Sequence, residues 1–388
     1  MSTRETPNAG DGPRSGRGSR AAAFTLLSLA PVSAELTFGA MPLSIAWLLF
    51  PLVVPMYGAG VLLIREVARR TGGGWPSVLV LGVAYELAED GIGLQALSSP
   101  NLYGAADWGP RVFGLNTTYW ESQVGYHLVF SVVIPIVLTD LLFPAHRDRP
   151  YLKRGGLICT GVVAVLGVAL VRVAIPPIAD PGYQAPVPLL AALAAAIAAL
   201  SLIAVRLPPG PKPAPGSAPA PAPGSGSAPG SGSAPGSGSA PGSGSGAGSG
   251  PGSGFESGRA LGAGWGPPAP ALLGVLAAAA PVAFLCLLLP FGAPPASGRG
   301  PWMLVPMALA AGLGAGALWL FGRWSGRLTD RHRILSAGGA LVGHTLFGAV
   351  VMATTPFDRI GLLVLAALTV ALLTLLHRVV GRRARAPR

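Results

Sequence analysis

The stretch Trp75–Leu97 reads WPSVLVLGVAYELAEDGIGLQAL and decides the class of this protein. As a helix rising 1.5 Å per residue, it is long enough to cross about 30 Å of hydrocarbon. It nevertheless contains three carboxylates, Glu86, Glu89 and Asp90, and a charge near the bilayer centre costs at least about 2.5–3.5 kcal/mol. Because such a cluster rarely persists without a role, the stretch predicts a membrane helix with a functional site.

The composition of the whole chain supports a membrane protein. Of 388 residues, 51% are hydrophobic and 11% are charged, and the mean hydropathy is +0.56. Soluble domains contain about 25% charged residues, so most of this chain is predicted to lie in lipid. The net charge of +12 does not indicate nucleic acid, because Lys and Arg lie in short stretches between apolar runs. Cys159 and Cys286 form no CxxC pair and are predicted to be small core residues.

The pattern of apolar runs predicts an all-α, polytopic integral membrane protein with about ten transmembrane helices in a 6+4 arrangement. The predicted spans are 21–39, 43–64, 75–98, 117–143, 155–175, 186–206, 269–290, 301–322, 334–354 and 359–380.

The distribution of basic residues predicts the orientation. Only four of the 27 Lys and Arg residues, Arg111, Arg172, Arg299 and Arg359, fall on one side of a ten-span topology. Basic residues accumulate on the cytoplasmic side, so we expect a cell-membrane protein with both termini in the cytoplasm. Its expected surroundings are the lipid bilayer, with anionic lipid at the cytoplasmic face. The start of the chain also resembles a cleavable signal peptide, which would leave the other spans in the same orientation.

A change in composition divides the chain into segments. The stretch 207–268 is rich in Gly, Ser, Pro and Ala and cannot bury enough apolar surface to offset the entropy of ordering. The predicted segments are a basic cytoplasmic N-terminal tail (1–20), a six-helix membrane domain (21–206), a disordered cytoplasmic linker (207–268), a four-helix membrane domain (269–380) and a basic cytoplasmic C-terminal tail (381–388).

The acidic cluster has potential partners at the same depth in the membrane. Glu86, Glu89 and Asp90 stand at positions i, i+3 and i+4, so they project from one face of the helix. Glu89 is about 21 Å from the Trp75 end of its span, and Glu35 is about 22 Å into the first span from the same side. His127 is about 15 Å from the other surface. These residues therefore predict a polar site within the membrane.

The chemistry of this cluster leaves two mechanisms open. Carboxylates this close cannot all be ionised in a low dielectric, so at least one should hold a proton near neutrality unless a cation binds. Glu89, Asp90 and His127 could bind a divalent metal, zinc being the first candidate, that activates water. The same groups could instead load and release a proton or Na⁺ during alternating access.

Other polar residues are interpreted as structural. Asp140 lies near the cytoplasmic end of its span and is expected to pair with basic residues there. His344 is expected to be structural, since no acidic residue accompanies it in the second set of spans. The loop 99–116 is expected to cap the site from outside or to anchor aromatic side chains at the interface.

Two resemblances add to this interpretation. Residues 31–145 resemble a set of uncharacterised bacterial and archaeal multi-pass membrane proteins. The recognisable pieces are Tyr57-Gly58-Ala59-Gly60, Ile64-Arg65-Glu66, Tyr85 through Gly91 (YELAEDG), Pro100-Asn101, His127 within YHLVFSVVIPI, and Asp140 through Pro144 (DLLFP).

The second resemblance, a distant one, is to the CPBP (Abi-type) intramembrane proteases, which have a Glu-Glu pair followed by Arg on one membrane helix and His on later helices. Glu89-Asp90 is similar to that pair, and His127 is similar to the following histidine. The chain departs from the family where Asp90 replaces the second Glu, where Leu94 replaces the Arg, and where Gln123 replaces a Phe.

The resulting functional hypothesis leans toward an intramembrane hydrolase that activates water. Its predicted catalytic residues are Glu86, Glu89, Asp90 and His127, of which the last three are also the predicted metal ligands. Glu35, Tyr85 and Gln95 are expected to support them. The alternatives are a proton- or cation-coupled transporter that uses the same carboxylates and a non-catalytic membrane scaffold.

Overall fold

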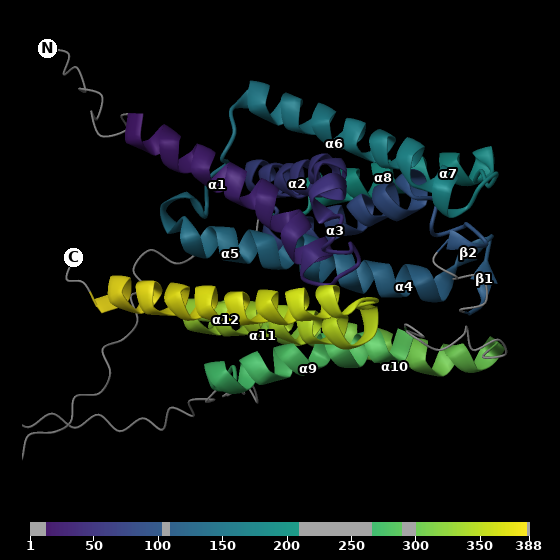
Figure 1. Ribbon diagram of the computed structural model, residues 1–388. Helices are drawn as coiled ribbons and strands as arrows, with labels where there is room; N and C mark the ends of the chain where they lie inside the picture. The colour runs from purple at the N-terminus through teal and green to yellow at the C-terminus, as the bar shows by residue number, and fades with distance from the viewer. Residues whose placement is uncertain (1–12, 103–108, 209–265, 289–299, 386–388) are drawn as a thin grey trace, which may run out of the picture. The chain divides into compact units, whose positions relative to one another are not determined.

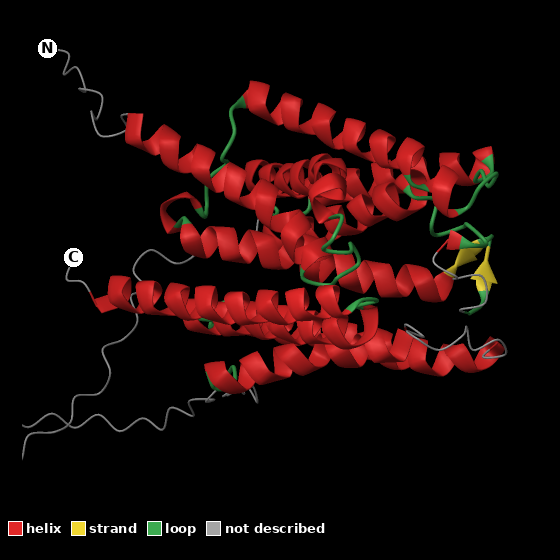
Figure 2. Ribbon diagram, viewed as in Figure 1, coloured by secondary structure: helices red, strands yellow, loops and turns green. Residues whose placement is uncertain are grey.

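The computed structural model describes residues 13–102, 109–208, 266–288 and 300–385, and these are almost entirely helical (Figures 1 and 2). The elements before residue 207 are α1 (Pro13–Pro31), the π-helical turn η1 (Val32–Leu36), α2 (Ala46–Thr71), α3 (Gly74–Glu86), the π-helical η2 (Leu87–Gly93), β1 (Arg111–Val112), β2 (Leu115–Asn116), α4 (Thr117–Tyr126), the π-helical η4 (His127–Val133), α5 (Ile134–Leu142), the 3₁₀ turn η5 (Pro144–His146), α6 (Arg154–Ala174), α7 (Pro176–Ala179) and α8 (Val187–Arg206).

The remaining elements follow residue 265. They are α9 (Pro270–Leu288), the 3₁₀ turn η6 (Gly300–Met303), α10 (Leu304–Trp324), α11 (Asp330–Phe347), the π-helical η7 (Gly348–Met352) and α12 (Pro356–Arg385). Parts of five predicted segments lie outside the described residues, namely residues 1–12 of the N-terminal tail, 103–108 of the 99–116 loop, 209–265 of the linker, 289–299 of the four-helix membrane domain and 386–388 of the C-terminal tail.

Eight helices within the described residues are long and apolar enough to cross a membrane, so the prediction of an all-α polytopic membrane protein is confirmed. They are Ala46–Thr71, Thr117–Leu142, Arg154–Ala179, Val187–Arg206, Pro270–Leu288, Leu304–Trp324, Asp330–Met352 and Pro356–Arg383.

The other two predicted spans also form helices, α1 with η1 and α3 with η2. Composition alone does not mark them as membrane-crossing. In the first, Arg20 and Glu35 lower the hydropathy, and the second contains the three carboxylates.

The described residues before 209 and after 266 together form one compact unit. The helices that are most buried within it are Thr117–Leu142 and Asp330–Met352, each 67% buried, whereas Leu304–Trp324 is only 6% buried. An apolar helix that is exposed in a membrane protein faces lipid. Figure 1 shows α5 beside α11 and α12, and α5 and α11 are in contact. The division of the chain into six-helix and four-helix domains stays a prediction.

Small residues allow α9 and α11 to pack closely. A Cβ on Gly339 would overlap the Gly274 carbonyl oxygen, and a Cβ on Gly343 would overlap the Ala278 carbonyl oxygen. Two small residues four apart on one helix let backbones approach, which is how membrane helices associate without a hydrophobic driving force. This contact fixes the position of α11, the helix that contains His344.

The prediction for the two cysteines is wrong. Cys159 in α6 and Cys286 in α9 are both exposed rather than buried in the core. Their spans are 11% and 22% buried, so most side chains on these helices point outward. Apolar neighbours in the sequence do not distinguish a lipid-facing position from a core position, because both are apolar in a membrane protein.

Candidate functional site

Three π-helical turns contain four of the predicted site residues. Glu35 lies in η1, Glu89 and Asp90 lie in η2, and His127 begins η4. A π-helical turn is rare, and it occurs frequently at functional sites. The predicted residues therefore lie where the backbone departs from the α-helix on three separate spans.

His127 lies between two carboxylates. Its Nδ1 is 3.5 Å from Glu89 Oε2, and its Nε2 is 3.5 Å from Asp90 Oδ2. Nδ1 also lies 2.9 Å from the Ser131 hydroxyl, one turn further along the helix. All three residues are at most 3% exposed, so the group is enclosed by protein. The sequence predicts that Glu89, Asp90 and His127 lie at the same depth in the membrane. The structure brings these three residues together.

The two ring nitrogens of His127 restrict where protons can be. If both carboxylates are ionised, both nitrogens must carry hydrogen, and the imidazole is then positively charged. If the imidazole is neutral, one nitrogen carries no hydrogen. It then faces a carboxyl group that is itself protonated, or Ser131 turns its hydroxyl to donate. The group thus has alternative proton positions within a few ångströms.

Glu86 belongs to the same cluster but has a different partner. The Trp120 indole N–H donates to Glu86 Oε2 at 3.1 Å, which links α3 to α4. Glu86 Oε1 has no hydrogen-bond partner within the described residues. The Tyr119 hydroxyl, in the same turn as Trp120, donates to Asp90 Oδ1 at 3.4 Å. Helix α4 therefore supplies polar side chains to both Glu86 and Asp90.

Glu35 is connected to the cluster through Tyr57, a residue that the sequence analysis did not include in the site. The Tyr57 hydroxyl donates to Glu35 Oε1 at 2.6 Å, and its ring centroid is 5.9 Å from that of His127. The rings of Tyr85 and Tyr126 lie 6.4 and 5.1 Å from the imidazole. The signal that could have identified Tyr57 is its phenol near the middle of an apolar span.

Glu89 is the least satisfied carboxylate of the site. Among the described residues, neither of its oxygens accepts a hydrogen bond of standard geometry. Its close contact is the 3.5 Å ion pair with His127. A buried charge without hydrogen bonds is costly, so Glu89 is the group of this cluster for which a proton or another cation offers the largest gain.

Gln95 lies beyond the cluster, at the end of the same helix. Its backbone has a φ of 57°, which is rare for a residue other than glycine, and its side chain is fully buried. The amide oxygen accepts the Ala185 N–H at 2.5 Å, while the amide nitrogen has no partner in the described part of the chain. Gln95 therefore ties the end of η2 to the segment before α8, away from the imidazole of His127.

The predicted metal ligands do not converge on one point. No group of three His, Cys, Asp or Glu side chains within the described ranges is arranged to hold a metal ion. Glu89 and Asp90 approach different nitrogens of the same ring, so the imidazole lies between them. A zinc site needs all its ligand atoms directed at one centre, about 2.0–2.3 Å away. The divalent metal stays a prediction, and the present arrangement does not fit it.

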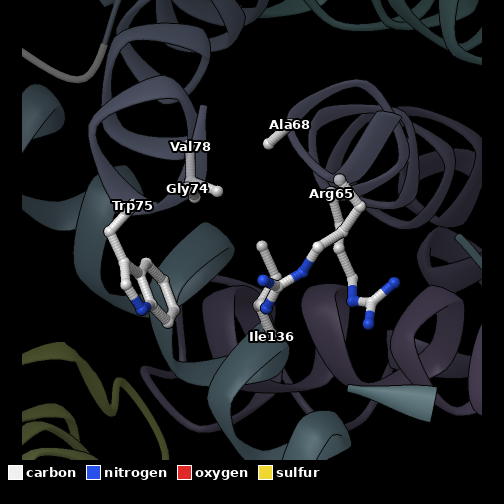
Figure 3. A pocket seen from close by; sticks show the side chains of 7 residues that line it. Arg65, Ala68, Gly74, Trp75, Val78 and Ile136 are labelled. Atoms are coloured by element: carbon white, nitrogen blue, oxygen red, sulfur yellow. The ribbon is translucent and has the colours of Figure 1, made fainter. Parts of the chain in front are cut away.

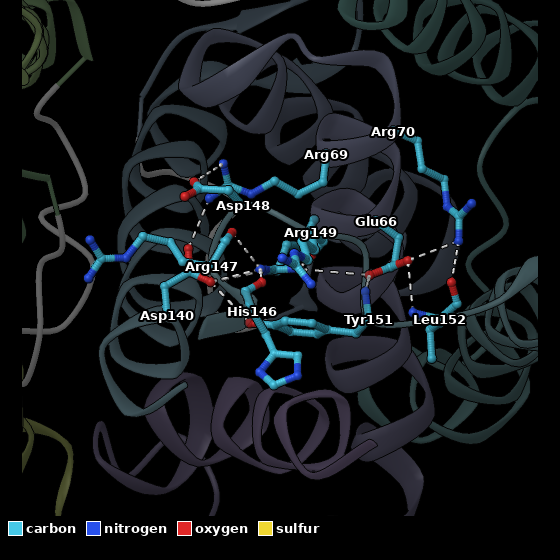
Figure 4. A network of polar contacts seen from close by, with 11 residues as sticks. Glu66, Arg69, Arg70, Asp140, His146, Arg147, Asp148, Arg149, Tyr151 and Leu152 are labelled. Atoms are coloured by element: carbon cyan, nitrogen blue, oxygen red, sulfur yellow. Dashed lines mark hydrogen bonds and ion pairs between the residues drawn. The ribbon is translucent and has the colours of Figure 1, made fainter. Parts of the chain in front are cut away.

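A network of charged side chains closes one end of the bundle (Figure 4). Arg65 is fully buried and donates to Asp140 Oδ1 at 2.9 Å, as predicted for Asp140. Arg69 pairs with the other oxygen of Asp140 at 3.0 Å. Tyr151 lies under the Arg65 guanidinium, whose Cζ is 3.4 Å from the ring centroid, and burial raises the pKa of the phenol above its usual range. Arg65 also donates to three carbonyl oxygens, those of His146, Arg147 and Arg149.

Glu66 completes this network from the other side of α2. Its carboxylate accepts the backbone N–H groups of Tyr151 and Leu152 at 2.5 and 3.2 Å. Beside it, Arg65, Trp75 and Ile136 line a cavity of about 10 Å³, room for a single water molecule (Figure 3). We refer to this end, defined by Arg65, Glu66, Asp140 and Tyr151, as the basic end.

The opposite end of the first six spans is held by Asp180. Its carboxylate accepts hydrogen bonds from the Ser99 hydroxyl and from the Asn101 amide, the latter at 3.0 Å. These hydrogen bonds hold the pKa of Asp180 below its usual range. Arg111 donates to the carbonyl oxygens of Ser98 and Ser99, at 3.0 and 2.9 Å. The loop after η2 is thereby fixed over the end of the helix that contains the carboxylates.

Comparison with known proteins gives a family but no activity. No curated protein and no solved structure matches the chain. Residues 24–212, which contain every residue of the site described above, match the model of an uncharacterized membrane protein family. Through this region, the chain is similar to that uncharacterized membrane protein family.

Proposed function

We propose that this protein is a proton-coupled membrane transporter that loads and releases protons at His127, Glu89 and Asp90. The observation that carries the proposal is that each ring nitrogen of His127 faces a different buried carboxylate. Histidine takes up and releases protons near neutral pH, and buried chains of Asp, Glu and His form the proton relays of membrane pumps and transporters. Glu35 and Tyr57 supply a second proton-accepting group beside the imidazole.

The charge balance of the site supports proton uptake. Glu35, Glu86, Glu89 and Asp90 could supply four negative charges, while His127 supplies at most one positive charge. In a low dielectric this excess is costly, and among the described residues His127 is the basic side chain that pairs with these carboxylates. Protons, which need no additional space in an enclosed site, are the cation best suited to neutralise them.

The test is proton movement across a sealed membrane. The full-length protein would be reconstituted into vesicles with a pH-sensitive dye inside, and a potassium diffusion potential would drive proton entry. We expect wild-type protein to change the internal pH and Glu89→Gln and His127→Asn to lower the rate by roughly tenfold or more. Glu121→Gln is the matched control, because Glu121 lies on the same span as His127 but is directed at the backbone of Ala311 in α10. Equal rates in all four proteins would reject the proposal.

A specific observation also favours the hydrolase as a second candidate. Glu89 has two buried oxygens without a hydrogen bond among the described residues, and a general base needs a free carboxylate oxygen to take a proton from water. This candidate predicts metal-free hydrolysis with Glu89 as the general base, so a membrane peptide that wild-type protein cleaves should stay intact with Glu89→Gln while the fold persists. Cleavage of such a peptide without proton movement into vesicles separates this candidate from the transporter.

A further inference from the structure

A second buried histidine lies near the site, in the C-terminal group of helices. His344 in α11 is fully buried, and its ring is stacked between Phe38 and Phe130, with centroid distances of 4.6 and 3.8 Å. Its Nδ1 is 3.4 Å from the Thr37 hydroxyl, while Nε2 has no hydrogen-bond partner in the described part of the chain. Placing an imidazole in the middle of an aromatic stack costs free energy, because its unpaired nitrogen loses its contact with water and gains no hydrogen bond.

One aromatic ring separates His344 from the proposed proton site. The Tyr126 centroid is 5.1 Å from that of His127 and 5.4 Å from that of His344. The same tyrosine hydroxyl donates to the Ala34 carbonyl oxygen, next to Glu35. The aromatic layer of Phe38, Phe130 and His344 therefore adjoins the carboxylate site directly.

A pocket of about 180 Å³, which has room for several water molecules, begins one residue beyond Phe38 of this layer. We call it the Asp358 pocket, and its walls include Gly39, Leu43, Met352, Thr354 and Asp358. Gly39 directly follows Phe38 of the stack, and Met352 ends the π-helical turn that begins four residues after His344. A Cβ on Gly348 would overlap the Phe38 carbonyl oxygen, so these two segments are in direct contact.

Asp358 gives the pocket a buried negative group. Its Oδ1 accepts the Leu43 N–H at 2.9 Å, and its Oδ2 accepts the Thr355 hydroxyl at 2.6 Å. Only 5% of Asp358 is exposed. A fixed carboxylate in a small wet pocket raises the local concentration of protons and other cations.

The other ends of the site are sealed by polar contacts described above. At the basic end, the guanidinium of Arg65 fills the space between α2 and the 143–153 loop with hydrogen bonds. At the opposite end of α3, Asp180 and Arg111 hold the loop that follows η2. The boundary at the Asp358 pocket differs, because it consists of stacked rings with one titratable member.

We infer that the Asp358 pocket is the entrance through which water and protons reach the carboxylate site, and that the Phe38–His344–Phe130 stack closes this entrance. The inference rests on the proposed function and specifies its access route. A dry aromatic layer blocks water until a charge within it attracts hydration, which is how apolar constrictions gate channels. Uptake of a proton by His344 creates that charge.

The groups around His344 favour its neutral form while the stack is closed, because burial disfavours the charged imidazole. From the first spans it contacts Thr37, Phe38, Tyr126 and Phe130, of which only Tyr126 is titratable. Gly343, its neighbour in sequence, packs against Ala278 of α9. No charged side chain pairs with His344 within the described residues, so proton uptake is not compensated by an ion pair and must be compensated by water.

The experiment follows the protonation of His127 rather than transport. Protein labelled with ¹⁵N-histidine would be placed in vesicles, in a background with Cys159→Ser and Cys286→Ser. The pH would be stepped on the side of the Asp358 pocket and held constant on the other side. Solid-state NMR would follow the His127 signal, assigned by its loss in His127→Asn. We expect this signal to respond to the pH on the pocket side.

Blocking the pocket should stop the response. Met352→Cys places a thiol on the pocket wall, and Phe357→Cys places one at the exposed start of α12 nearby. After treatment with a charged, membrane-impermeant thiol reagent, we expect the His127 response to slow at least tenfold in Met352→Cys and to be unchanged in Phe357→Cys. An unchanged response in labelled Met352→Cys, or a His127 signal that follows the opposite side, would overturn the inference.

A second variant tests the histidine itself. His344→Phe keeps an aromatic ring in the stack but removes both nitrogens, so the fold should persist while the His127 response slows at least tenfold. A response as fast as in wild type would show that His344 has only a packing role.

The access route and the proposed transport can be tested separately. If His127 titrates from the pocket side but vesicles show no net proton movement, the transporter is rejected and the entrance stands.

Discussion

At the scale of single residues, the unusual feature is that several buried polar atoms lack partners while their neighbours are well bonded. The Tyr57 hydroxyl has a 2.6 Å hydrogen bond to Glu35, whereas the Tyr85 hydroxyl has no hydrogen-bond partner among the described residues. Both phenols lie near the same imidazole. This difference allows two chemically identical substitutions to be compared.

Tyr57→Phe should lower the free energy of unfolding by about 1–2 kcal/mol, because it leaves Glu35 without its donor in a buried site. Tyr85→Phe removes a hydroxyl that lies beside Glu89 without a hydrogen bond of standard geometry, so its effect should be smaller than that of Tyr57→Phe. Unfolding in mixed detergent, followed by circular dichroism, measures both. A loss in Tyr85→Phe that equals or exceeds the loss in Tyr57→Phe would contradict the assigned hydrogen bonds.

The Arg65–Asp140 pair offers a second residue-level comparison. Arg65→Met leaves Asp140 buried with Arg69 and the Tyr151 hydroxyl as its remaining partners, and removing one member of a buried pair typically costs about 3–5 kcal/mol. The double variant Arg65→Met/Asp140→Leu removes both charges and should recover part of that loss, as measured by the same unfolding experiment. A double variant that is less stable than Arg65→Met by the full cost of Asp140→Leu alone would show that the two residues do not interact.

At the scale of elements, the loop after η2 is held by the carboxylate of Asp180. Hydrogen bonds from Ser99 and Asn101 favour the charged form and lower the pKa in the folded protein. A depressed folded-state pKa contributes stability that is present above the usual pKa of an aspartate, about 3.9, and is lost as the pH falls below it. The attachment of this loop should therefore be insensitive to pH near neutrality and weaken in acid.

Hydrogen exchange of residues 98–102 measures this attachment. Protection should fall as the pH is lowered from about 4 toward the folded-state pKa, after correction for the intrinsic pH dependence of exchange. In Asp180→Asn the corrected profile should be flat, with lower protection at neutral pH. A wild-type profile that is flat over the same range would show that the Asp180 carboxylate does not hold the loop.

At the scale of the whole molecule, contacts join the first six spans to the last four. Arg147 pairs with Asp330 at 3.1 Å, Leu43 donates to Asp358, and Gly348 packs against Phe38. These contacts do not involve residues 209–265. Two chains covering 1–208 and 266–388 should therefore associate when they are produced together.

Co-purification of two such chains from one membrane tests this association. Gly348→Leu should reduce recovery of the partner chain several-fold, because its side chain would overlap the Phe38 backbone. Gly312→Leu is the matched control, since the position of its Cβ is open. Equal recovery in both variants would indicate that the two groups of helices associate through other contacts.

Helix periodicity explains which parts of this molecule can be predicted from its sequence. The spacing of 3.6 residues per turn and the rise of 1.5 Å per residue are enough to place Glu89, Asp90 and His127 at one level. The same spacing puts Trp120, the partner of Glu86, on the face of its helix that contains His127. Periodicity carries no information on π-helical turns, so the three that contain the site were not predicted. It also cannot pair distant spans, which is why the stacking of His344 on Phe38 and Phe130 was missed.

The buried guanidinium of Arg65 also has a consequence for how the chain is made. Its countercharge, Asp140, lies 75 residues later in the sequence, on the fourth predicted span. At a synthesis rate of about 5–20 residues per second, Arg65 enters the insertion machinery roughly 4–15 s before its partner has been synthesised. The second span can enter the membrane with Arg65 at the end of its apolar run, but the ion pair with Asp140 can form only after the fourth span has been synthesised. Closure of the basic end is thus a late step in the biogenesis of this half of the protein.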